Sequence, residues 1–272
     1  MTALVVAEAV SYRAGGRLLV DGVSLAVARG EMVVIAGPNG AGKSTLMRLL
    51  CGELAPASGA VRYGAEPLAT LPAWRLAGRR AVLPQASRLA FPFRVREVAR
   101  IGLDGIGRGL TRPARQAIVA RALAEADLTE LAERNYQTLS GGEQQRAQFA
   151  RVLCQLEAGR TLSSDQVLFL DEPIASLDLR HQLALLDAAA RRARAGLAVV
   201  AVLHDLNLAA AYADSLVVMD AGRVVEAGRP SAVLSDRLLA EVFGVSLGVG
   251  RVPPDGQAFV LPERPSLEPF QV

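Results

Sequence analysis

Continuous apolar runs alternate along the chain with segments of helical spacing. Residues 31–36, 166–170 and 197–203 are mainly apolar, and each run ends at a glycine or a polar residue. Such runs predict strands buried on both faces, as in the parallel sheet of an α/β protein. A core-facing helix is predicted by five apolar residues at helical spacing, which are Leu179, Leu183, Leu186, Ala190 and Ala193.

Other segments predict further layers around this sheet. Strands before residue 36, with turns at Gly15, Gly16 and Gly22, favour an antiparallel β layer. Residues 86–160 are expected to be mostly helical, because stretches such as 116–126 and 143–156 are rich in Ala, Leu, Arg and Gln.

The end of the chain has a different character. Residues 252–272 hold five of the 14 prolines and few periodic apolar positions, which predicts a tail.

Composition excludes several classes of protein. A chain of 272 residues with 51% hydrophobic residues can form one large domain or two small ones. The net charge of +3 comes without a basic block, so nucleic-acid binding is not favoured. Two cysteines, Cys51 and Cys154, exclude a disulfide framework and favour a reducing compartment. The start does not resemble a secretory signal, and no charge-free apolar run reaches the roughly 18 residues of a membrane span.

Lys43 is the only lysine among the 30 basic residues. Codon bias toward arginine explains why the other 29 basic residues are arginines. The one lysine that remains then marks a position where arginine cannot perform the same function. An ammonium is a compact point charge that fits between phosphate oxygens, whereas a guanidinium is a wide planar fork.

The phosphate loop, residues 37–45, surrounds this lysine and matches the pattern G-x-x-x-x-G-K-[ST]. It follows a predicted strand and precedes an apolar helix start, which aims backbone N–H groups at a phosphate. A chance glycine turn is the alternative. The residues expected to bind a nucleoside triphosphate here are Gly37, Pro38, Asn39, Gly40, Ala41, Gly42, Lys43, Ser44 and Thr45, with Ser44 also offering its hydroxyl to Mg²⁺.

Two carboxylates end the apolar run 166–170. Asp171 and Glu172 lie at the carboxyl end of a predicted parallel strand, which is where open α/β sheets bind ligands. We expect Asp171 to hold Mg²⁺, through water, and Glu172 to act as the general base on the attacking water. A solvated acidic turn is the alternative interpretation.

The signature turn, residues 139–142, reads Leu-Ser-Gly-Gly and opens a predicted helix at Glu143. It resembles the signature of the ATP-binding subunits of ABC transporters. Physically it is a second helix N-terminus suited to an anion. A plain capped helix, with Ser140 as the N-cap and Glu143 three residues on, also fits but does not explain the paired glycines.

The resemblance covers residues 4–244 and implies a fold. This is a P-loop NTPase (RecA-like) core with an antiparallel β layer and an α-helical subdomain at about 86–160. The expected ATPase domain is 1–244, followed by a short tail at 245–272. It also implies a head-to-tail dimer of two copies of the chain, in which Ser140, Gly141 and Gly142 of one copy close over ATP held by the other.

The remaining family positions are present in order. The resemblance implies that Tyr12 stacks on adenine and that Gln85 reaches Mg²⁺ and the attacking water. It also implies that residues 176–178, here called the interface loop and containing Asp178, cross the dimer interface, and that His204 contacts the γ-phosphate. The alternatives are that Tyr12 is an ordinary strand residue and that His204 is a strand-end histidine without a function. His181 is expected to be a surface helix residue.

Two positions depart from the family pattern. Glu143 stands where many members have glutamine, and Ile174 stands where threonine is common. Neither change removes a group that hydrolysis needs.

The resemblance also implies membrane partners, namely two transmembrane permease subunits and, indirectly, a periplasmic substrate-binding protein. Their contact surface is expected at residues 86–95, where Leu89, Phe91, Phe93 and Val95 alternate with polar or small residues. The alternative is that the two phenylalanines fill the local core. The chain would then sit at the cytoplasmic face of the inner membrane.

Residues 83–98 and 157–165 are similar to ATPases of bacterial importers for iron chelates, haem and vitamin B12, and most of all to haemin-import subunits. Import of ferric siderophores or vitamin B12 stays open. A soluble ATPase acting on DNA or ribosomes is less favoured, because the chain has one cassette and no long heptad run. Lys43, Asp171, Glu172 and His204 argue against a regulator that has lost hydrolysis.

Overall fold

A six-stranded sheet forms the centre of the computed structural model, which describes residues 3–85, 89–253 and 256–262. Its order is β10-β9-β3-β8-β7-β6, with β9, β3, β8, β7 and β6 parallel and β10 antiparallel at one edge. The strands are β3 (Met32–Ala36), β6 (Arg80–Leu83), β7 (Val167–Asp171), β8 (Ala198–Val202), β9 (Ser215–Asp220) and β10 (Arg223–Gly228).

An antiparallel sheet lies beside this core, in the order β2-β1-β4-β5. Its strands are β1 (Ala3–Ala14), β2 (Arg17–Ala28), β4 (Ser58–Tyr63) and β5 (Glu66–Pro67). Gly15 and Gly16 form the β1–β2 turn, as predicted, with φ values of 55° and 77°. The turn predicted at Gly22 is wrong, because that residue lies inside β2 with φ at 60°.

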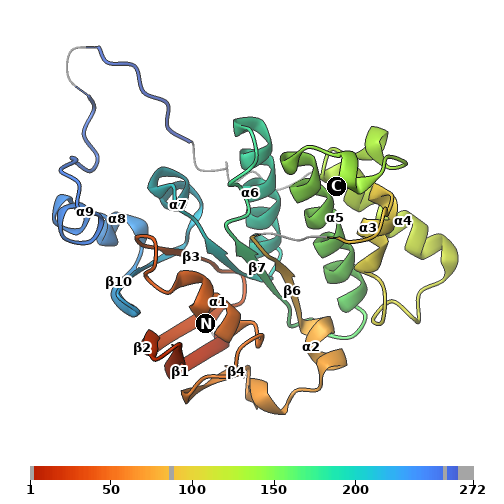
Figure 1. The fold of residues 1–272 in the computed structure, drawn as a ribbon, viewed down its shortest axis with the longest axis horizontal. Helices are drawn as coiled ribbons and strands as arrows, with labels where there is room; N and C mark the ends of the chain where they lie inside the picture. The colour runs from red at the N-terminus through yellow and green to blue at the C-terminus, as the bar shows by residue number, and fades with distance from the viewer. Residues whose placement is uncertain (1–2, 86–88, 254–255, 263–272) are drawn as a thin grey trace.

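Helices cover both faces of the six-stranded sheet and build a separate region beyond β6 (Figure 1). The α-helices are α1 (Lys43–Leu50), α2 (Ala73–Arg79), α3 (Val95–Ile101), α4 (Arg112–Glu125), α5 (Gly141–Gly159), α6 (Leu179–Arg194), α7 (Leu206–Tyr212), α8 (Pro230–Val233) and α9 (Asp236–Phe243). Short 3₁₀ turns are η1 (Leu68–Thr70), η2 (Thr129–Leu131) and η3 (Tyr136–Thr138). After α9, the described residues 244–253 and 256–262 form no helix or strand. The predicted α/β fold is confirmed.

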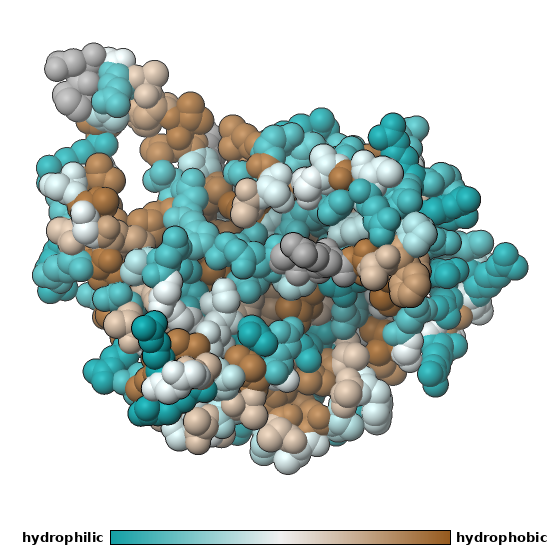
Figure 2. Space-filling model, in the orientation of Figure 1, coloured by the Kyte–Doolittle hydropathy of each residue, from teal (hydrophilic) through white to brown (hydrophobic). Residues whose placement is uncertain are grey.

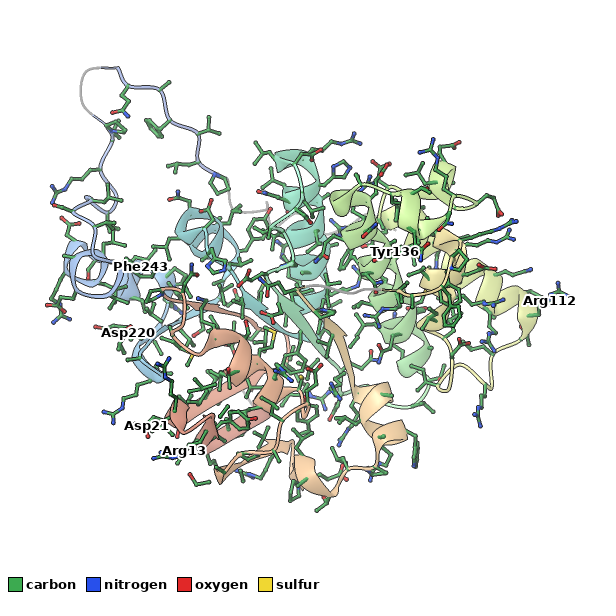
Figure 3. The ribbon with its side chains drawn as sticks, in the orientation of Figure 1. Arg13, Asp21, Arg112, Tyr136, Asp220 and Phe243 are labelled. Atoms are coloured by element: carbon green, nitrogen blue, oxygen red, sulfur yellow. The ribbon has the colours of Figure 1, made fainter. Side chains whose placement is uncertain are left out.

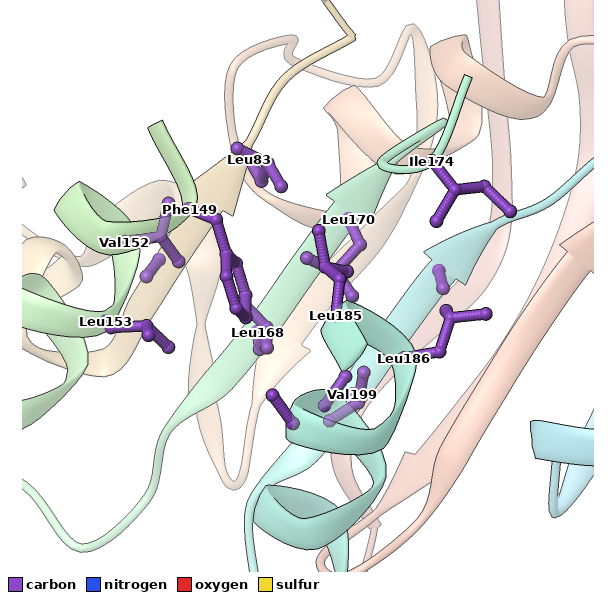
Figure 4. Close-up of a cluster of buried hydrophobic side chains, with 14 of the residues drawn as sticks. Leu83, Phe149, Val152, Leu153, Leu168, Leu170, Ile174, Leu185, Leu186 and Val199 are labelled. Carbon is purple, nitrogen blue, oxygen red and sulfur yellow. The ribbon is translucent and has the colours of Figure 1, made fainter. Parts of the chain in front are cut away.

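Two apolar cores explain the continuous apolar runs. Successive residues of a strand point to opposite faces of a sheet. In β7, Leu168 and Leu170 therefore pack with Phe149 of α5 and Leu186 of α6 (Figure 4), whereas Phe169 packs with the core beneath α1. Because both faces are covered, every position of β3, β7 and β8 is buried.

The start of α6 differs from the prediction. Leu179 is the first residue of this helix and is 60% exposed, so it does not face the core. Leu186, Ala190 and Ala193 are buried as expected. A helix commonly begins at the surface, where its N-cap side chain satisfies the first N–H groups.

The region of α3, α4 and α5 lies on one side of the sheet, and Arg112 and Tyr136 mark it in Figure 3, opposite Arg13 and Asp21. Side chains of α5 fasten it to the edge strand. Gln155 donates to the carbonyl oxygens of Ala77 (3.0 Å) and Arg80 (2.9 Å). No helix among the described residues is long and apolar enough to cross a bilayer.

Candidate functional site

The phosphate loop approaches neighbouring backbone so closely that only glycine fits at two positions. A Cβ on Gly37 would lie 2.1 Å from the carbonyl oxygen of Met219 in β9. A Cβ on Gly42 would lie 2.3 Å from the carbonyl oxygen of Leu19 in β2. Both glycines also have positive φ, at 145° and 97°. The loop is thus wedged between β9 and the antiparallel layer.

Lys43 is buried, with 5% of its surface exposed. Its Nζ donates to the carbonyl oxygens of Gly37 (2.9 Å) and Pro38 (2.8 Å). Burial lowers the pKa of the ammonium, and the carboxylates of Glu172 and Asp171 act in the opposite direction. The single lysine therefore places a compact positive charge inside the turn of its own loop.

A hydrogen bond joins the phosphate loop to the end of β7. Ser44 Oγ donates to Asp171 Oδ1 at 3.0 Å. Asp171 is buried, and this burial raises the pKa of its carboxyl group, although the bond from Ser44 lowers it. Two of the three residues expected to reach Mg²⁺, Ser44 and Asp171, are thus in contact.

Glu172 is held between side chains from the neighbouring strand ends. Gln85 Nε2, just after β6, donates to Glu172 Oε2 at 2.7 Å. His204 Nε2, just after β8, lies 2.6 Å from Glu172 Oε1. The backbone of Glu172 has φ at 47°, a left-handed conformation that is strained for a non-glycine residue. Parallel strand ends meet at one edge of the sheet, and this brings the three side chains together.

Tyr12 lies on β1 in the antiparallel layer. It is half-buried, packs partly against the core beneath α1 and pairs with Val20 in the β1–β2 ladder. The neighbouring Leu19 carries the carbonyl that abuts Gly42. The antiparallel layer therefore brings the Tyr12 strand to the phosphate loop, and stacking on adenine stays a prediction.

The signature turn is the capped start of α5. Ser140 is the N-cap, and its Oγ accepts from the N–H of Glu143 at 3.3 Å. The Glu143 carboxylate accepts from the N–H (2.7 Å) and the hydroxyl (2.8 Å) of Ser140, and these bonds lower its pKa. The departure at Glu143 therefore supplies the second half of a capping box.

The interface loop lies against the signature turn. A Cβ on Gly142 would be 2.9 Å from the carbonyl oxygen of Ser176, which explains the second glycine. Asp178 is the N-cap of α6 and is exposed, as are Ser140 and Gly141.

Ile174, the other departure, is buried and packs in the core near Leu170 and Leu186 (Figure 4). A hydroxyl is not needed at such a position.

His181 is the residue that the sequence interpretation missed. Its ring is largely covered, with 17% of the side chain exposed, and it lies between the carboxylates of Asp178 and Asp127. Its place three residues after an aspartate N-cap was the available signal.

The predicted site residues thus form two groups. The first contains the phosphate loop with Gln85, Asp171, Glu172 and His204. The second contains Ser140, Gly141, Gly142 and Asp178.

The donors present fit Mg²⁺ bound together with a nucleotide. Ser44, Asp171 and Gln85 offer a hydroxyl, a carboxylate and an amide oxygen, which are hard ligands. Within residues 3–85, 89–253 and 256–262, no group of three or more His, Cys, Asp or Glu residues could hold a metal. A magnesium ion at Ser44 and Asp171 would therefore take further ligands from phosphate and water, as Mg²⁺ commonly does.

The expected partner surface is present only in part. Phe91 is 67% exposed, whereas Phe93 packs partly against the core, and the two rings meet edge-on at 6.2 Å. The alternation ends at Val95, the first residue of α3, which is buried in the same core as Val98 and Ala99. Residues 86–88 lie outside the described residues. An open cleft of about 700 Å³ has Pro84 and residues of α2 in its lining, and apolar side chains show around α2 in Figure 2.

A glycine phosphate loop, an acidic strand end and a second glycine turn on this sheet define a class: a P-loop ATPase of the nucleotide-binding cassette type. The family model described as ABC transporter matches residues 20–175. The chain belongs to the ABC transporter family.

Curated relatives cover nearly the whole chain. It is 47% identical over 263 residues to the hemin import ATP-binding protein HmuV of Rhodopseudomonas palustris (strain BisA53), covering 97% of this chain and 96% of the relative. HmuV of Rhizobium meliloti (strain 1021) is 44% identical over 257 residues, covering 94% and 97%. Among solved structures, an ATP binding subunit of an ABC transporter superposes with a TM-score of 0.71 at 26% identity, over 89% of this chain and 94% of that one.

Proposed function

We propose that the chain is the ATP-binding and ATP-hydrolysing subunit of a bacterial importer that energises haem (haemin) uptake across the inner membrane. The observation that carries the ATPase assignment is Glu172, held by Gln85 and His204 beside the buried Lys43 and Asp171. The haem assignment is supported by relatives named for hemin import that align with 97% and 94% of the chain.

The phosphate loop binds the triphosphate. Its backbone N–H groups and the N-terminus of α1 face the anion, and Lys43 neutralises charge on the phosphate oxygens. Ser44, Asp171 and Gln85 would hold Mg²⁺, which supplies further positive charge to those oxygens. The ring of Tyr12 offers the adenine a stacking surface.

Glu172 accepts a proton from the attacking water. The water oxygen bonds to the terminal phosphorus as the bond to the bridging oxygen breaks, so a carboxylate within reach of the water can act as the base. Gln85 and His204 fix the direction of the Glu172 carboxylate, because each contacts a different oxygen of it. His204 is exposed and so can also reach a γ-phosphate.

The second group of residues acts on a second copy of the chain. Ser140, Gly141 and Asp178 are exposed, and the α5 N-terminus offers N–H groups to an anion. A head-to-tail dimer places this surface over the ATP on the partner's phosphate loop and completes two sites at once.

Two permease subunits receive the motion of this dimer, and a periplasmic substrate-binding protein delivers the cargo to them. The exposed ring of Phe91 and the open cleft lined in part by Pro84 suit a short helix from each permease. This arrangement puts the chain at the cytoplasmic face of the inner membrane, where the substrate never touches it.

The glutamate is tested by Glu172→Gln, with Glu130→Gln at an exposed position as the control. We expect turnover to fall about 10²- to 10⁴-fold while nucleotide binding persists. We also expect the variant to elute as a dimer with Mg-ATP in size-exclusion chromatography. Normal phosphate release by Glu172→Gln would remove this residue from the role of base.

The cargo is tested by uptake in proteoliposomes that contain the chain and the permease that co-purifies with it. ATP-dependent uptake of haem supports the assignment. If the proteoliposomes take up ferric siderophore or vitamin B12 but not haem, the haem assignment is wrong and the ATPase assignment stands.

A further inference from the structure

Asp127 joins two helices that belong to different parts of the fold. It follows α4, and its φ of 54° is unusual for a residue with a side chain. Its carboxylate Oδ2 lies 3.7 Å from Arg146 of α5 and 3.8 Å from Arg180 and 3.3 Å from His181 of α6. Helix α5 begins at the signature turn, and α6 begins directly after the interface loop.

His181 contacts a carboxylate with each of its ring nitrogens. Nδ1 lies 2.7 Å from Asp178 Oδ1, and Nε2 lies 3.3 Å from Asp127 Oδ2. The ring is largely covered, whereas the neighbouring Arg180 is 82% exposed. A covered ring between two carboxylates is a better-defined link than an exposed arginine, which loses side-chain entropy in a surface pair.

The connection after α4 is also fastened on its other sides. Arg146, only 13% exposed, donates to the carbonyl oxygens of Ala126 and Asp127, and so fixes this connection to α5. Arg192 of α6 forms two 2.7 Å bonds with the carboxylate of Glu125, and these lower the pKa of that group. His181 is the contact that extends this network to the interface loop.

We propose that His181 is a positioning residue whose ring bridges Asp178 to Asp127, so that the interface loop and the signature turn keep one relative position. This rests on the proposed function, in which Asp178 and Ser140 act together on a second copy of the chain.

The bridge depends on the proton count of the ring. A neutral imidazole has one N–H, so only one of the two carboxylates receives a hydrogen bond, whereas an imidazolium donates to both. The charged groups that face the ring are the carboxylates of Asp178 and Asp127, with Arg180 and Arg146 around Asp127. The bridge is therefore complete only with the imidazolium form of the ring, and a neutral ring keeps one of its two bonds.

Two variants each keep one half of the bridge. The amide nitrogen of Asn lies near the place of Nδ1, and that of Gln near the place of Nε2. His181→Asn therefore retains the bond to Asp178, and His181→Gln retains the bond to Asp127. Neither side chain titrates. Arg180→Gln is the matched control, because it neighbours the same carboxylate but is exposed.

Mg-ATP hydrolysis by the purified full chain is measured from about pH 5.5 to 8.5, together with urea unfolding. We expect both His181 variants to lower kcat about 3- to 10-fold at the acid end, with little change in KM for ATP. The ratio of wild-type to variant kcat should approach one as the pH rises, and Arg180→Gln should match the wild type throughout.

The possible outcomes separate a positioning role of His181 from a structural role. A constant ratio across pH, or activity lost in step with stability, would mean a merely structural role and overturn the proposal. Unchanged kcat in both variants overturns it as well. If the wild type itself fails to hydrolyse ATP, the proposed function has failed, and that result is separate from any effect at His181.

Discussion

The two groups of site residues differ in burial, although both are built on a glycine turn that opens a helix. The phosphate loop side buries Gly37, Lys43 and Asp171, and these groups find their partners within the chain. The signature side leaves Ser140, Gly141 and Asp178 exposed, and Ser140 and Asp178 each cap the helix that follows. One half is a pocket that is already organised, and the other is a surface available to another molecule.

The difference in burial follows from the groups on each side, which are buried charges on the phosphate loop side and a helix N-terminus at the signature turn. A buried charge needs a partner in the fold, so Lys43 is fixed by carbonyl oxygens and Asp171 by Ser44. A helix N-terminus needs only a short polar side chain to satisfy its first N–H groups. Mutations on the first side should therefore damage a preformed pocket, and mutations on the second side should act mainly on association.

Removing the lysine should produce the largest loss. Lys43→Ala deletes the only positive charge buried in the phosphate loop, and we expect kcat to fall about 10²- to 10³-fold, as when one preorganised donor is lost. Arg48→Ala on the exposed face of the same helix is the control. Phosphate release and nucleotide binding measure the result. Turnover near the wild-type rate in Lys43→Ala would contradict the conclusion that the phosphate loop side is the organised pocket.

Two glycine substitutions compare how tightly the phosphate loop and the signature turn are packed. Gly37→Ala forces a Cβ to within 2.1 Å of a carbonyl oxygen, so we expect the free energy of unfolding to fall by about 1–3 kcal/mol. Gly141→Ala meets nothing closer than 3.9 Å, so its stability should stay within about 0.5 kcal/mol of the wild type. Urea unfolding measures both. Equal losses would show that the two turns are equally constrained.

A cap deletion tests the signature side. Ser140→Ala removes the N-cap of α5 and should lower the free energy of unfolding by about 1 kcal/mol. Nucleotide binding by the monomer should stay unchanged, while turnover falls. Ser235→Ala removes an equivalent cap from α9 and should cost similar stability without affecting turnover. An equal loss of turnover in both variants would contradict a special role for Ser140.

The smallest expected effect is that Asp171 and Glu143 change the stability of the fold in opposite directions as the pH changes. Burial raises the pKa of Asp171, so its contribution to stability is present at low pH and is lost as the pH rises through its folded pKa. Hydrogen bonds from Ser140 lower the pKa of Glu143, so its contribution is present at higher pH and is lost as the pH falls through its folded pKa. Thermal unfolding of the metal-free protein from about pH 3 to 6 should show Asp171→Asn flattening one trend and Glu143→Gln the other. Shifts of the same sign would contradict the assignment.

Local patterns in the sequence predict some elements well. The apolar runs at 31–36, 166–170 and 197–203 correspond to β3, β7 and β8, because burial on both faces removes any need for polar positions. The signature turn was predictable as a helix start because the capping box is local. Predictions that depend on neighbours were weaker. Val95 is buried in the core and does not join an exposed apolar surface, and Gly22 lies within a strand and forms no turn.

The amino-acid sequence by itself determined which groups have chemistry to offer: one lysine in a glycine loop, two carboxylates after an apolar strand and a capped glycine turn. Short-range rules of spacing, capping and burial are enough for that. Only the tertiary structure decided which groups meet. The order of parallel strands puts Gln85 and His204 on opposite oxygens of Glu172, and the packing of α6 against the end of α4 puts His181 between two carboxylates. His181 and Asp178 lie three residues apart, but the other contacts join residues far apart in the chain, and no local pattern specifies those.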